Sequence, residues 1–258
     1  GVDVVKMNEN ELREFRRHQT AMVFQKFALL PHRSVLDNTV FGLEVQGIER
    51  KAAVEIAMRW LERVGLMGFE QKYPNQLSGG MQQRVGLARA LSNDAPVLLM
   101  DEAYSALDPL IRTDMQTVLL DIQKEIRKTI VFITHDLDEA LRLGDQIAIL
   151  RDGEIIQQGT SQDIVLRPAD DYVANFVKEV NRGRVVHVEA IMTPLPPAAA
   201  AAHPEGRATI MAGTTIEEAV RMLAAAPDGD VIVTAQDGTP IGAVTFRQLA
   251  AAMVNAVH

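Results

Sequence analysis

Cysteine is absent from this sequence of 258 residues. Disulfide bonds, thiolate catalysis and cysteine-ligated metal sites are therefore excluded. Long hydrophobic runs are also missing, since none approaches the roughly 20 apolar residues that a membrane-spanning helix needs. The sequence predicts no signal peptide either. We therefore expect any role at a membrane to depend on a partner protein.

An excess of basic residues is missing as well. The formal net charge is -8 at pH 7 and the isoelectric point is near 5.3. We expect no nucleic-acid partner, because phosphate backbones attract basic surfaces. A nucleotide needs only a local cluster of polar groups, so nucleotide binding is not excluded. With 47% hydrophobic residues, the chain can bury the cores of one large domain and one small domain.

The most informative motif is LSGGMQQR, from Leu77 to Arg84, which leads into helix-forming sequence. A loop that opens a helix presents free backbone amides, and such amides bind phosphate oxygens. An isolated SGG would more often be a simple glycine turn before a helix. Here VLLMDE follows, from Val97 to Glu102, an apolar strand that ends in carboxylates. Together the two segments resemble the signature motif and the Walker B strand of ATP-binding cassette ATPases.

This resemblance implies a fold of the α/β class, a P-loop NTPase cassette with a parallel-sheet core and a helical subdomain. It also implies a loop GxxxxGK(S/T), whose amides and lysine hold the nucleotide phosphates and whose hydroxyl holds magnesium. No such run occurs in the 258 residues, and residues 1–17 resemble the stretch that normally follows this loop and its helix. We therefore expect an incomplete cassette without Walker A, inactive by itself. An experimental truncation, a broken gene and a degenerate subunit remain open explanations.

Polar side chains follow three apolar segments. The run Ala21–Phe24 ends at Gln25, Val97–Met100 is followed by Asp101 and Glu102, and Thr129–Thr134 is followed by His135 and Asp136. The last two runs are too continuous for half-exposed strands and predict buried parallel strands. Ligands of open α/β sheets bind beyond the carboxyl ends of the strands, so we expect Asp101, Glu102, His135 and Asp136 to share one crevice. The strand end at Gln25 is a further natural ligand position.

The resemblance implies a role for each residue of this crevice. Asp101 would hold Mg²⁺ directly or through water, and Gln25 would contact the same ion. Glu102 would be the general base or would orient the attacking water. His135 would contact the γ-phosphate of ATP. A single histidine at a strand end is more often structural, but the Thr-His-Asp sequence after the Walker B strand favours ligation. ATP and Mg²⁺ are thus the predicted cofactors, with Glu102 and His135 as catalytic residues.

Further nucleotide contacts are expected outside this crevice. The residues concerned are Ser78, Gly79, Gly80, Gln82 and Asp108. Asp108 lies in SALDP, which resembles the cassette D-loop and would cross toward a second subunit; an aspartate turn before proline is the alternative. In this family the phosphate loop of one cassette faces the signature serine of another. A homodimer of this chain would therefore have two signature motifs and no phosphate loop, so neither ATP site could close. Paired with an intact cassette, this chain could complete one ATP site at most.

The segment after the crevice predicts a hairpin over residues 146–158, with a primed turn at its Asp-Gly pair. A capping box formed by Thr160 and Asp163 then predicts a helix. We expect the cassette domain to span residues 1–182.

Residues 183–258 are predicted to be a linker followed by a single cystathionine-β-synthase (CBS)-like domain. The segment Met192–Gly206 is rich in alanine and proline, which predicts a linker with few packing contacts across this boundary. The order helix, strand, strand, helix that follows resembles one CBS repeat. That family normally pairs two repeats, and Gln248 stands where an aspartate often binds ribose. We therefore expect regulation or assembly from this small α+β domain.

Longer stretches resemble a particular subfamily. Residues 22–48, 77–91, 100–112 and especially 133–150 resemble ATPase subunits of glycine betaine and proline importers. This implies that the intact protein hydrolyses ATP to drive uptake of quaternary-amine osmoprotectants. The implied partners are a membrane-spanning permease, a second ATPase subunit and, indirectly, a substrate-binding protein. The implied location is peripheral, on the cytoplasmic side of the inner membrane.

Two other functions remain to be weighed. A catalytically silent regulatory cassette subunit would lend its signature motif to a partner, and the absent phosphate loop motivates this alternative. A DNA-repair cassette would need long heptad insertions between the half-motifs and a basic surface, and the sequence has neither. Betaine, proline and choline are not distinguished, because no residue of this chain is expected to contact the substrate.

Overall fold

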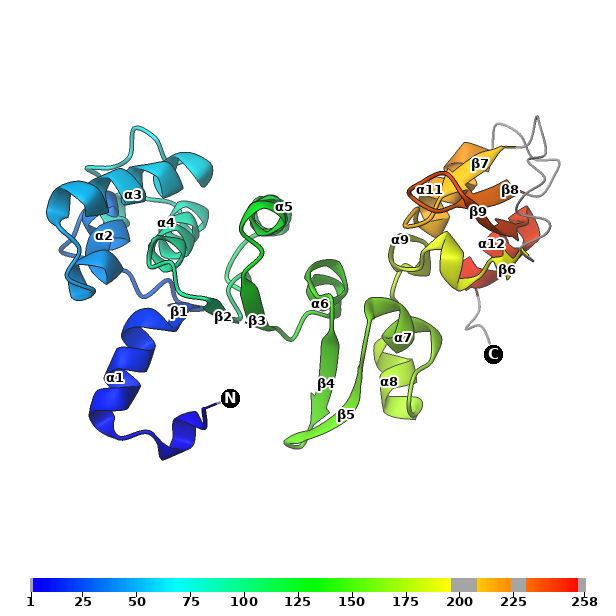
Figure 1. Ribbon diagram of the computed structural model, residues 1–258, viewed down its shortest axis with the longest axis horizontal. Coiled ribbons are helices and arrows are strands. Elements are labelled where there is room, and N and C mark those ends of the chain that lie inside the picture. Colours follow the sequence, from blue (N-terminus) through cyan, green and yellow to red (C-terminus); the bar gives the residue numbers. More distant parts are fainter. Residues whose placement is uncertain (1, 196–207, 224–230, 255–258) are drawn as a thin grey trace. The chain divides into compact units, whose positions relative to one another are not determined.

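The computed structural model describes residues 2–195, 208–223 and 231–254. Its contacts divide the chain into two compact units, Gly1–His135 and Asp136–His258 (Figure 1). This division falls before the predicted end of the cassette at residue 182, and the predicted domain assignment stays a prediction.

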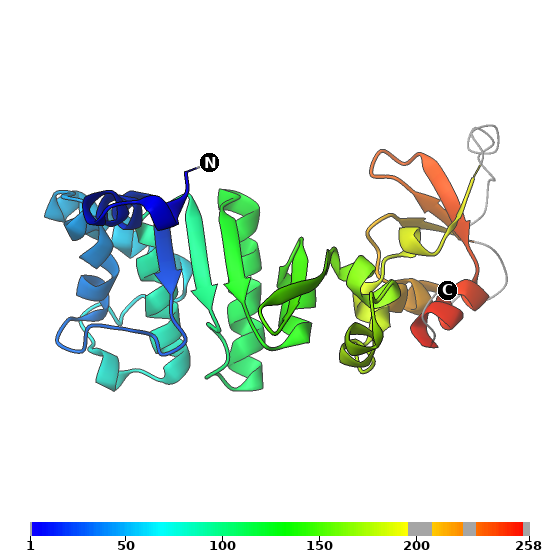
Figure 2. The same cartoon turned by 90° about the horizontal axis from the view of Figure 1, so that it is seen from below.

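The first unit is built on a parallel sheet. Its strands lie in the order β1-β2-β3 and are β1 (Thr20–Val23), β2 (Val97–Asp101) and β3 (Thr129–Ile133). Both pairs are parallel, with Val23 beside Met100 and Asp101 beside Ile133; Figure 2 shows the strands side by side. The carboxyl ends of the strands therefore meet at one edge of the sheet. The predicted α/β class with a parallel-sheet core is confirmed.

The prediction that β3 is buried on both faces is wrong. Alternate residues of this strand are exposed, and the exposed fraction is 48% for Val131 and 59% for Ile133. β3 lies at the edge of the sheet, and the described residues of the unit cover only one of its faces. A continuous apolar run shows that both faces of a strand could be buried. Whether they are buried depends on what packs against each face.

Some helices of this unit contact the sheet, and several pack with one another. The helices are α1 (Glu9–His18), α2 (Val35–Val45), α3 (Arg50–Arg63), α4 (Gly79–Ser92) and α5 (Pro109–Ile126), with 3₁₀ turns η1 (Val4–Lys6) and η2 (Pro74–Gln76). Helices α2, α3 and α4 pack against one another, and Val40, Leu43, Ala53 and Ala57 form a buried core within this group. The predicted helical subdomain is thus present.

The second unit begins with a helix and the predicted hairpin. Its first elements are α6 (Leu137–Leu143), β4 (Ile147–Arg151), β5 (Glu154–Gly159), α7 (Ser161–Leu166), α8 (Asp171–Phe176), α9 (Arg182–Val185) and η3 (Val188–Ala190). Strands β4 and β5 are antiparallel. Asp152 and Gly153 have φ values of 54° and 85°, as a primed two-residue turn requires. The hairpin prediction is confirmed.

The capping box at the start of α7 is also confirmed. Thr160 Oγ1 accepts a hydrogen bond from the Asp163 amide at 3.2 Å. Asp163 Oδ2 accepts bonds from the Thr160 hydroxyl at 2.6 Å and from the Thr160 amide at 3.1 Å. The hydroxyl and then the amide lower the pKa of Asp163 below its ordinary value of 3.8.

This carboxylate is expected to make stability depend on pH. Because the folded pKa is depressed, its stabilisation is present above the ordinary value of 3.8 and is lost as pH falls through the lowered folded value. Asp163→Asn should therefore flatten the fall of the melting temperature between about pH 5 and pH 2. Asp145→Asn, a change at an exposed loop carboxylate, is the control. Equal slopes for wild type and Asp163→Asn would contradict the expectation.

The rest of the second unit is a mixed sheet with two helices. The sheet order is β6-β9-β8-β7, and the elements are β6 (Thr193–Pro194), β7 (Thr209–Met211), α11 (Ile216–Leu223), β8 (Val231–Thr234), β9 (Pro240–Val244) and α12 (Phe246–Val254). The predicted order helix, strand, strand, helix is confirmed. Gln248 Oε1 accepts from the Thr245 amide at 2.8 Å, and its Nε2 donates to Thr193 Oγ1 at 3.0 Å. Gln248 therefore ties the start of α12 to β6.

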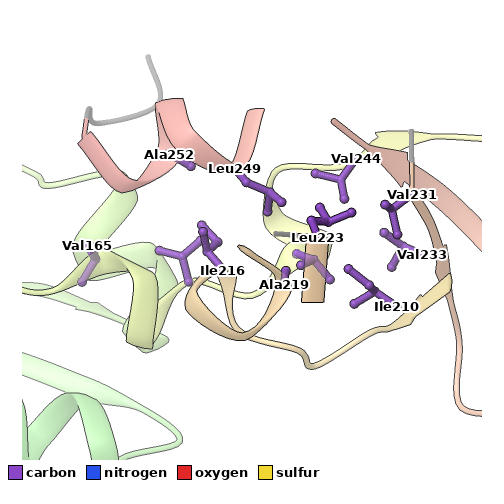
Figure 3. Packing of buried hydrophobic residues seen from close by; sticks show 12 residues of the cluster. Val165, Ile210, Ile216, Ala219, Leu223, Val231, Val233, Val244, Leu249 and Ala252 are labelled. Atoms are coloured by element: carbon purple, nitrogen blue, oxygen red, sulfur yellow. The ribbon is translucent and has the colours of Figure 1, made fainter. Parts of the chain in front are cut away.

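The prediction of few contacts across residue 183 is wrong. One buried cluster joins Val165 of α7 to Ile216 of α11 and Leu249 of α12 (Figure 3). Strand β6, which lies within the predicted linker, pairs with β9; residues 196–206 of that linker lie outside the described residues. The prediction was based on the composition of the alanine- and proline-rich stretch. The apolar residues before and after that stretch pack together in one core, and the composition of the stretch does not reveal this.

Candidate nucleotide-hydrolysis site

Three predicted site residues meet at the carboxyl edge of the parallel sheet. Gln25, which follows β1, donates a hydrogen bond from Nε2 to Oε2 of Glu102 at 2.7 Å. His135, which follows β3, has its Nδ1 3.4 Å from the same carboxylate oxygen. Glu102 itself comes directly after β2. The parallel register of the strands therefore brings together groups that are far apart in the sequence.

A cavity of about 370 Å³ opens at this point, lined by Gln25, Lys26, Phe27, Glu102, Ser105, Ala106 and His135. The exposed fraction is 31% for the Glu102 side chain and 69% for that of His135. The carboxylate is thus partly withdrawn from water, while the imidazole stands at the rim. A larger hollow of about 500 Å³, lined mainly by residues of α1, contains none of the predicted site residues, so we place the chemistry at the smaller cavity.

The backbone at Glu102 is strained. Its φ is 42°, in the left-handed region that is unfavourable for a residue with a long side chain unless surrounding contacts impose it. The Glu102 amide donates to the Ile133 carbonyl at 2.9 Å. The Glu102 carbonyl accepts from Ser105 Oγ at 3.0 Å. These two bonds fix the peptide at the end of β2, so the carboxylate remains at the cavity.

Ser105 is a site residue that sequence reasoning missed. Besides donating to the Glu102 carbonyl, its hydroxyl accepts a hydrogen bond from Gln25 Nε2 at 3.2 Å. Its position three residues after Glu102 could have indicated this contact, because a serine hydroxyl commonly bonds a carbonyl three residues earlier in the chain. Ser105 therefore links the candidate base to Gln25.

Asp101 and Gln25 have the donor types that magnesium prefers. Asp101 ends β2 beside Ile133 and is half-buried. The hydrogen bonds from Gln25 to Glu102 and Ser105 use Nε2, so its carbonyl oxygen can face a cation. Among the described residues, no group of three or more His, Cys, Asp or Glu side chains could hold a metal ion. Phosphate oxygens and water would have to complete the shell, as they commonly do for Mg²⁺.

The LSGGMQQR segment forms the start of α4, as predicted. Ser78 is the N-cap residue, and its Oγ accepts from the Met81 amide at 3.3 Å. Ser78 and Gly79 are exposed, and Gly80 is half-buried. The start of the helix is therefore accessible from solvent, and the amides not bonded to Ser78 can receive an anion there.

Gly80 lies at a close approach between α4 and α5. A Cβ added there would stand 2.5 Å from Cγ2 of Ile111, whereas a Cβ at Gly79 would have only an ordinary contact of 3.6 Å with Phe27. We expect Gly80→Ala to lower the free energy of unfolding by about 1–3 kcal/mol relative to Gly79→Ala, because the Ile111 side chain or the helices must shift to admit the methyl group. Urea unfolding measures this. Ile111→Ala should restore stability in the Gly80→Ala background, and strictly additive effects would contradict the proposed clash.

Two other predicted contact residues form local bonds. Gln82 Nε2 donates to the Leu77 carbonyl at 3.2 Å. Asp108 is the N-cap of α5, and its Oδ1 accepts from the amides of Leu110 and Ile111 at 3.2 and 3.1 Å. The alternative interpretation of Asp108, a turn before proline, thus describes its local geometry. Its role toward a second subunit stays a prediction.

Similar proteins identify the family. The model of the ABC transporter family matches residues 2–105. The chain is 56% identical over 189 residues to the glycine betaine transport ATP-binding protein OpuAA of Bacillus subtilis, covering 73% of this chain and 45% of that protein. It is 46% identical over 238 residues to the trimethylamine N-oxide transport system ATP-binding protein TmoW of Ruegeria pomeroyi, covering 92% of this chain and 68% of that protein.

A solved structure agrees with these matches. It is a dimeric, post-hydrolysis state of the ATP-binding cassette MJ0796 bound to ADP and Pi, with 34% identity and a TM-score of 0.55 over 60% of this chain and 68% of that chain. The chain spans about half the length of several curated relatives. Its match to most of the TmoW protein, together with the parallel sheet and helical subdomain, shows that this chain belongs to the ABC transporter family.

Proposed function

We propose that this chain is part of an ATPase subunit that couples ATP hydrolysis to import by an ABC transporter. The observation that carries the proposal is the convergence of Gln25, Glu102 and His135 at the carboxyl edge of a parallel sheet. Catalysis of phosphoryl transfer depends mainly on positioning and on charge stabilisation. A fixed carboxylate beside a histidine meets the first need, and Asp101, which immediately precedes Glu102 in the chain, and Gln25 supply the donor types for a cation.

Glu102 is the proposed general base. One carboxylate oxygen already accepts a bond from Gln25, and the other can accept one from the attacking water. As the water oxygen bonds to the γ-phosphorus and the bond to the β-phosphate oxygen breaks, the proton of the water passes to Glu102. Ser105 positions both partners, because it bonds the Glu102 carbonyl and the Gln25 amide.

His135 and the magnesium ligands are proposed to bind the terminal phosphate. His135 presents Nδ1 to Glu102 and leaves Nε2 for a γ-phosphate oxygen, to which Nε2 donates when it carries a proton. Asp101 and Gln25 would hold Mg²⁺, which when bound neutralises charge on the phosphates. The ATP and Mg²⁺ requirement is therefore part of the proposal.

A second ATPase subunit is proposed to complete the site. Ser78, Gly79, Gly80 and Gln82 lie at or near the exposed start of α4, where they would face the phosphates held by the partner, with Asp108 near the contact. The MJ0796 cassette is described as dimeric with ADP and Pi. We propose the same composite arrangement here.

The remaining partners are proposed from the relatives. Among the described residues, no helix is long and apolar enough to cross a bilayer. We propose that a membrane-spanning permease binds this subunit peripherally on the cytoplasmic side and that a substrate-binding protein acts indirectly. The small domain of the second unit is proposed to be CBS-like, with a role in regulation or assembly.

The proposed cargo is a small osmoprotectant with a methylated amine, of the glycine betaine and proline betaine class. OpuAA and TmoW are named for transport of glycine betaine and of trimethylamine N-oxide. Uptake of labelled glycine betaine into proteoliposomes that contain the whole transporter tests this. We expect ATP-dependent uptake that unlabelled trimethylamine N-oxide or proline betaine reduces. Transport of an unrelated cargo, with no response to betaine, would refute the assignment.

A further inference from the structure

The loop that carries Gln25 has an unusual backbone. Phe27 and Ala28 are consecutive, neither is glycine, and their φ values are 52° and 46°. Left-handed conformations are unfavourable for such residues because Cβ approaches the backbone, and two in succession persist only where other contacts impose them. Something in the surrounding structure must therefore hold this loop.

Arg89 of α4 makes those contacts. Its Nη1 donates to the Ala28 carbonyl at 2.7 Å, and its Nη2 donates to the Phe27 carbonyl at 3.1 Å. The rigid fork of a guanidinium suits two successive carbonyl oxygens, which a lysine ammonium cannot match. Burial lowers the pKa of Arg89, as expected for a guanidinium withdrawn from water against the loop.

The same face of α4 is shaped to receive the loop. A Cβ at Gly86 would lie 3.7 Å from the Phe27 carbonyl oxygen, and one at Gly79 would lie 3.6 Å from the Phe27 ring. Gly79, Gly86 and Arg89 are seven and three residues apart and therefore share one side of the helix. Beyond the loop, the Leu30 amide donates to Asn38 Oδ1 at 2.8 Å. The loop is therefore held at one end by strand β1 and at the other by this bond, and Arg89 contacts it in between.

We propose that Arg89 is a positioning residue that clamps residues 25–28 and so keeps the Gln25 amide at Glu102. The clamp also joins two parts of the site, because Arg89 lies on the helix that begins with the LSGGMQQR segment. A shift of α4 on ligand binding at Ser78 would then be transmitted to Gln25. The clamp stands on the geometry alone, whereas its effect on catalysis rests on the proposed ATPase function.

Hydrogen exchange of the 258-residue chain, followed by NMR, tests the clamp without reference to activity. Arg89→Ala should speed exchange of the backbone amides of residues 25–28 and of the Gln25 side-chain amide at least tenfold. Arg84→Ala is the matched control: Arg84 lies on the same helix and donates to a carbonyl, that of Val64, so loop exchange should not change. Unaltered loop exchange in Arg89→Ala overturns the inference.

A rescue variant separates clamping from simple packing of α4. Asparagine adopts left-handed conformations more readily than alanine, so Ala28→Asn should restore at least half of the lost protection in the Arg89→Ala background. No rescue would overturn the clamp. Should Arg89→Ala fail to fold, Arg89→Lys decides the question, because it keeps the charge and loses the fork. It should speed loop exchange while leaving the exchange of α3 unchanged, and protection equal to wild type would overturn the clamp.

The catalytic consequence is measured in the whole transporter. Arg89→Ala should lower kcat for ATP at least tenfold and change KM less than threefold, since Gln25 is displaced from the reacting groups. An unchanged kcat would overturn the link to catalysis. Absence of ATPase activity in the wild-type transporter would refute the proposed function and leave the exchange experiments to decide the clamp.

Discussion

Glu102→Gln is expected to reduce ATP hydrolysis by the whole transporter by about 10²–10⁴-fold, the usual contribution of a general base. The amide keeps the size of the carboxylate and can still bond Gln25, which donates to Glu102 Oε2 at 2.7 Å. It cannot take a proton from water. ATP should therefore still bind, and the closed dimer should accumulate. Phosphate release and binding of labelled ATP, measured on the same preparation, give the two quantities separately.

Glu55→Gln is the matched control for this experiment, because Glu55 is an exposed carboxylate on α3 outside the cavity. Its hydrolysis rate should equal that of wild type. His135→Ala should also slow turnover, by less than the loss of the base, since it removes a proposed phosphate contact and a neighbour of Glu102 at 3.4 Å but leaves the carboxylate itself in place. Hydrolysis by Glu102→Gln at the wild-type rate would remove Glu102 from the mechanism.

Leu249→Ala is expected to destabilise the second unit by about 2–5 kcal/mol, as large-to-small changes in packed cores do. Leu249 is 0% exposed and lies in the cluster that also contains Val165 and Ile216. Truncation removes apolar contacts and leaves a cavity that the surrounding strands and helices fill only in part. Urea unfolding, followed by exchange of amides in α11 and β8, measures the loss.

Met253→Ala provides the comparison on the same helix, because Met253 is 39% exposed. Its effect should remain within about 0.5 kcal/mol, the usual range for surface changes. Equal losses for the two variants would show that position in the cluster does not decide stability.

The buried cluster that contains Val165 and Leu249 also predicts that deletion of the C-terminal residues destabilises the segment that remains. Removing residues 184–258 would uncover Val165, which is 0% exposed, because its cluster with Ile216 and Leu249 would be lost, although Ile164 of α7 would keep its own partners. We expect limited proteolysis to cut the remaining 136–183 segment faster than the same segment in the intact chain. Equal cleavage rates would restore the prediction of few contacts across this boundary.

The amino-acid sequence by itself determined the local elements of this protein. The apolar runs placed β1 and β2, the LSGGMQQR segment placed the start of α4, and the Thr160 and Asp163 pair placed the start of α7. Each of these features depends on residues a few positions apart, so periodicity, capping and turn chemistry are sufficient. The strand ends are different, because Glu102 and His135 are far apart in the sequence. Their meeting at one edge was expected from the general rule that ligands of open α/β sheets bind beyond the carboxyl ends of the strands.

Only the tertiary structure decided which partners these groups have. Ser105 reaches Gln25 across 80 residues of sequence, Arg89 reaches the Ala28 carbonyl across 61 residues, and β3 is left with one exposed face. The core that joins Val165 to Leu249 likewise crosses the alanine- and proline-rich stretch. Such contacts depend on how elements pack in three dimensions, and neither composition nor spacing along the chain encodes that packing.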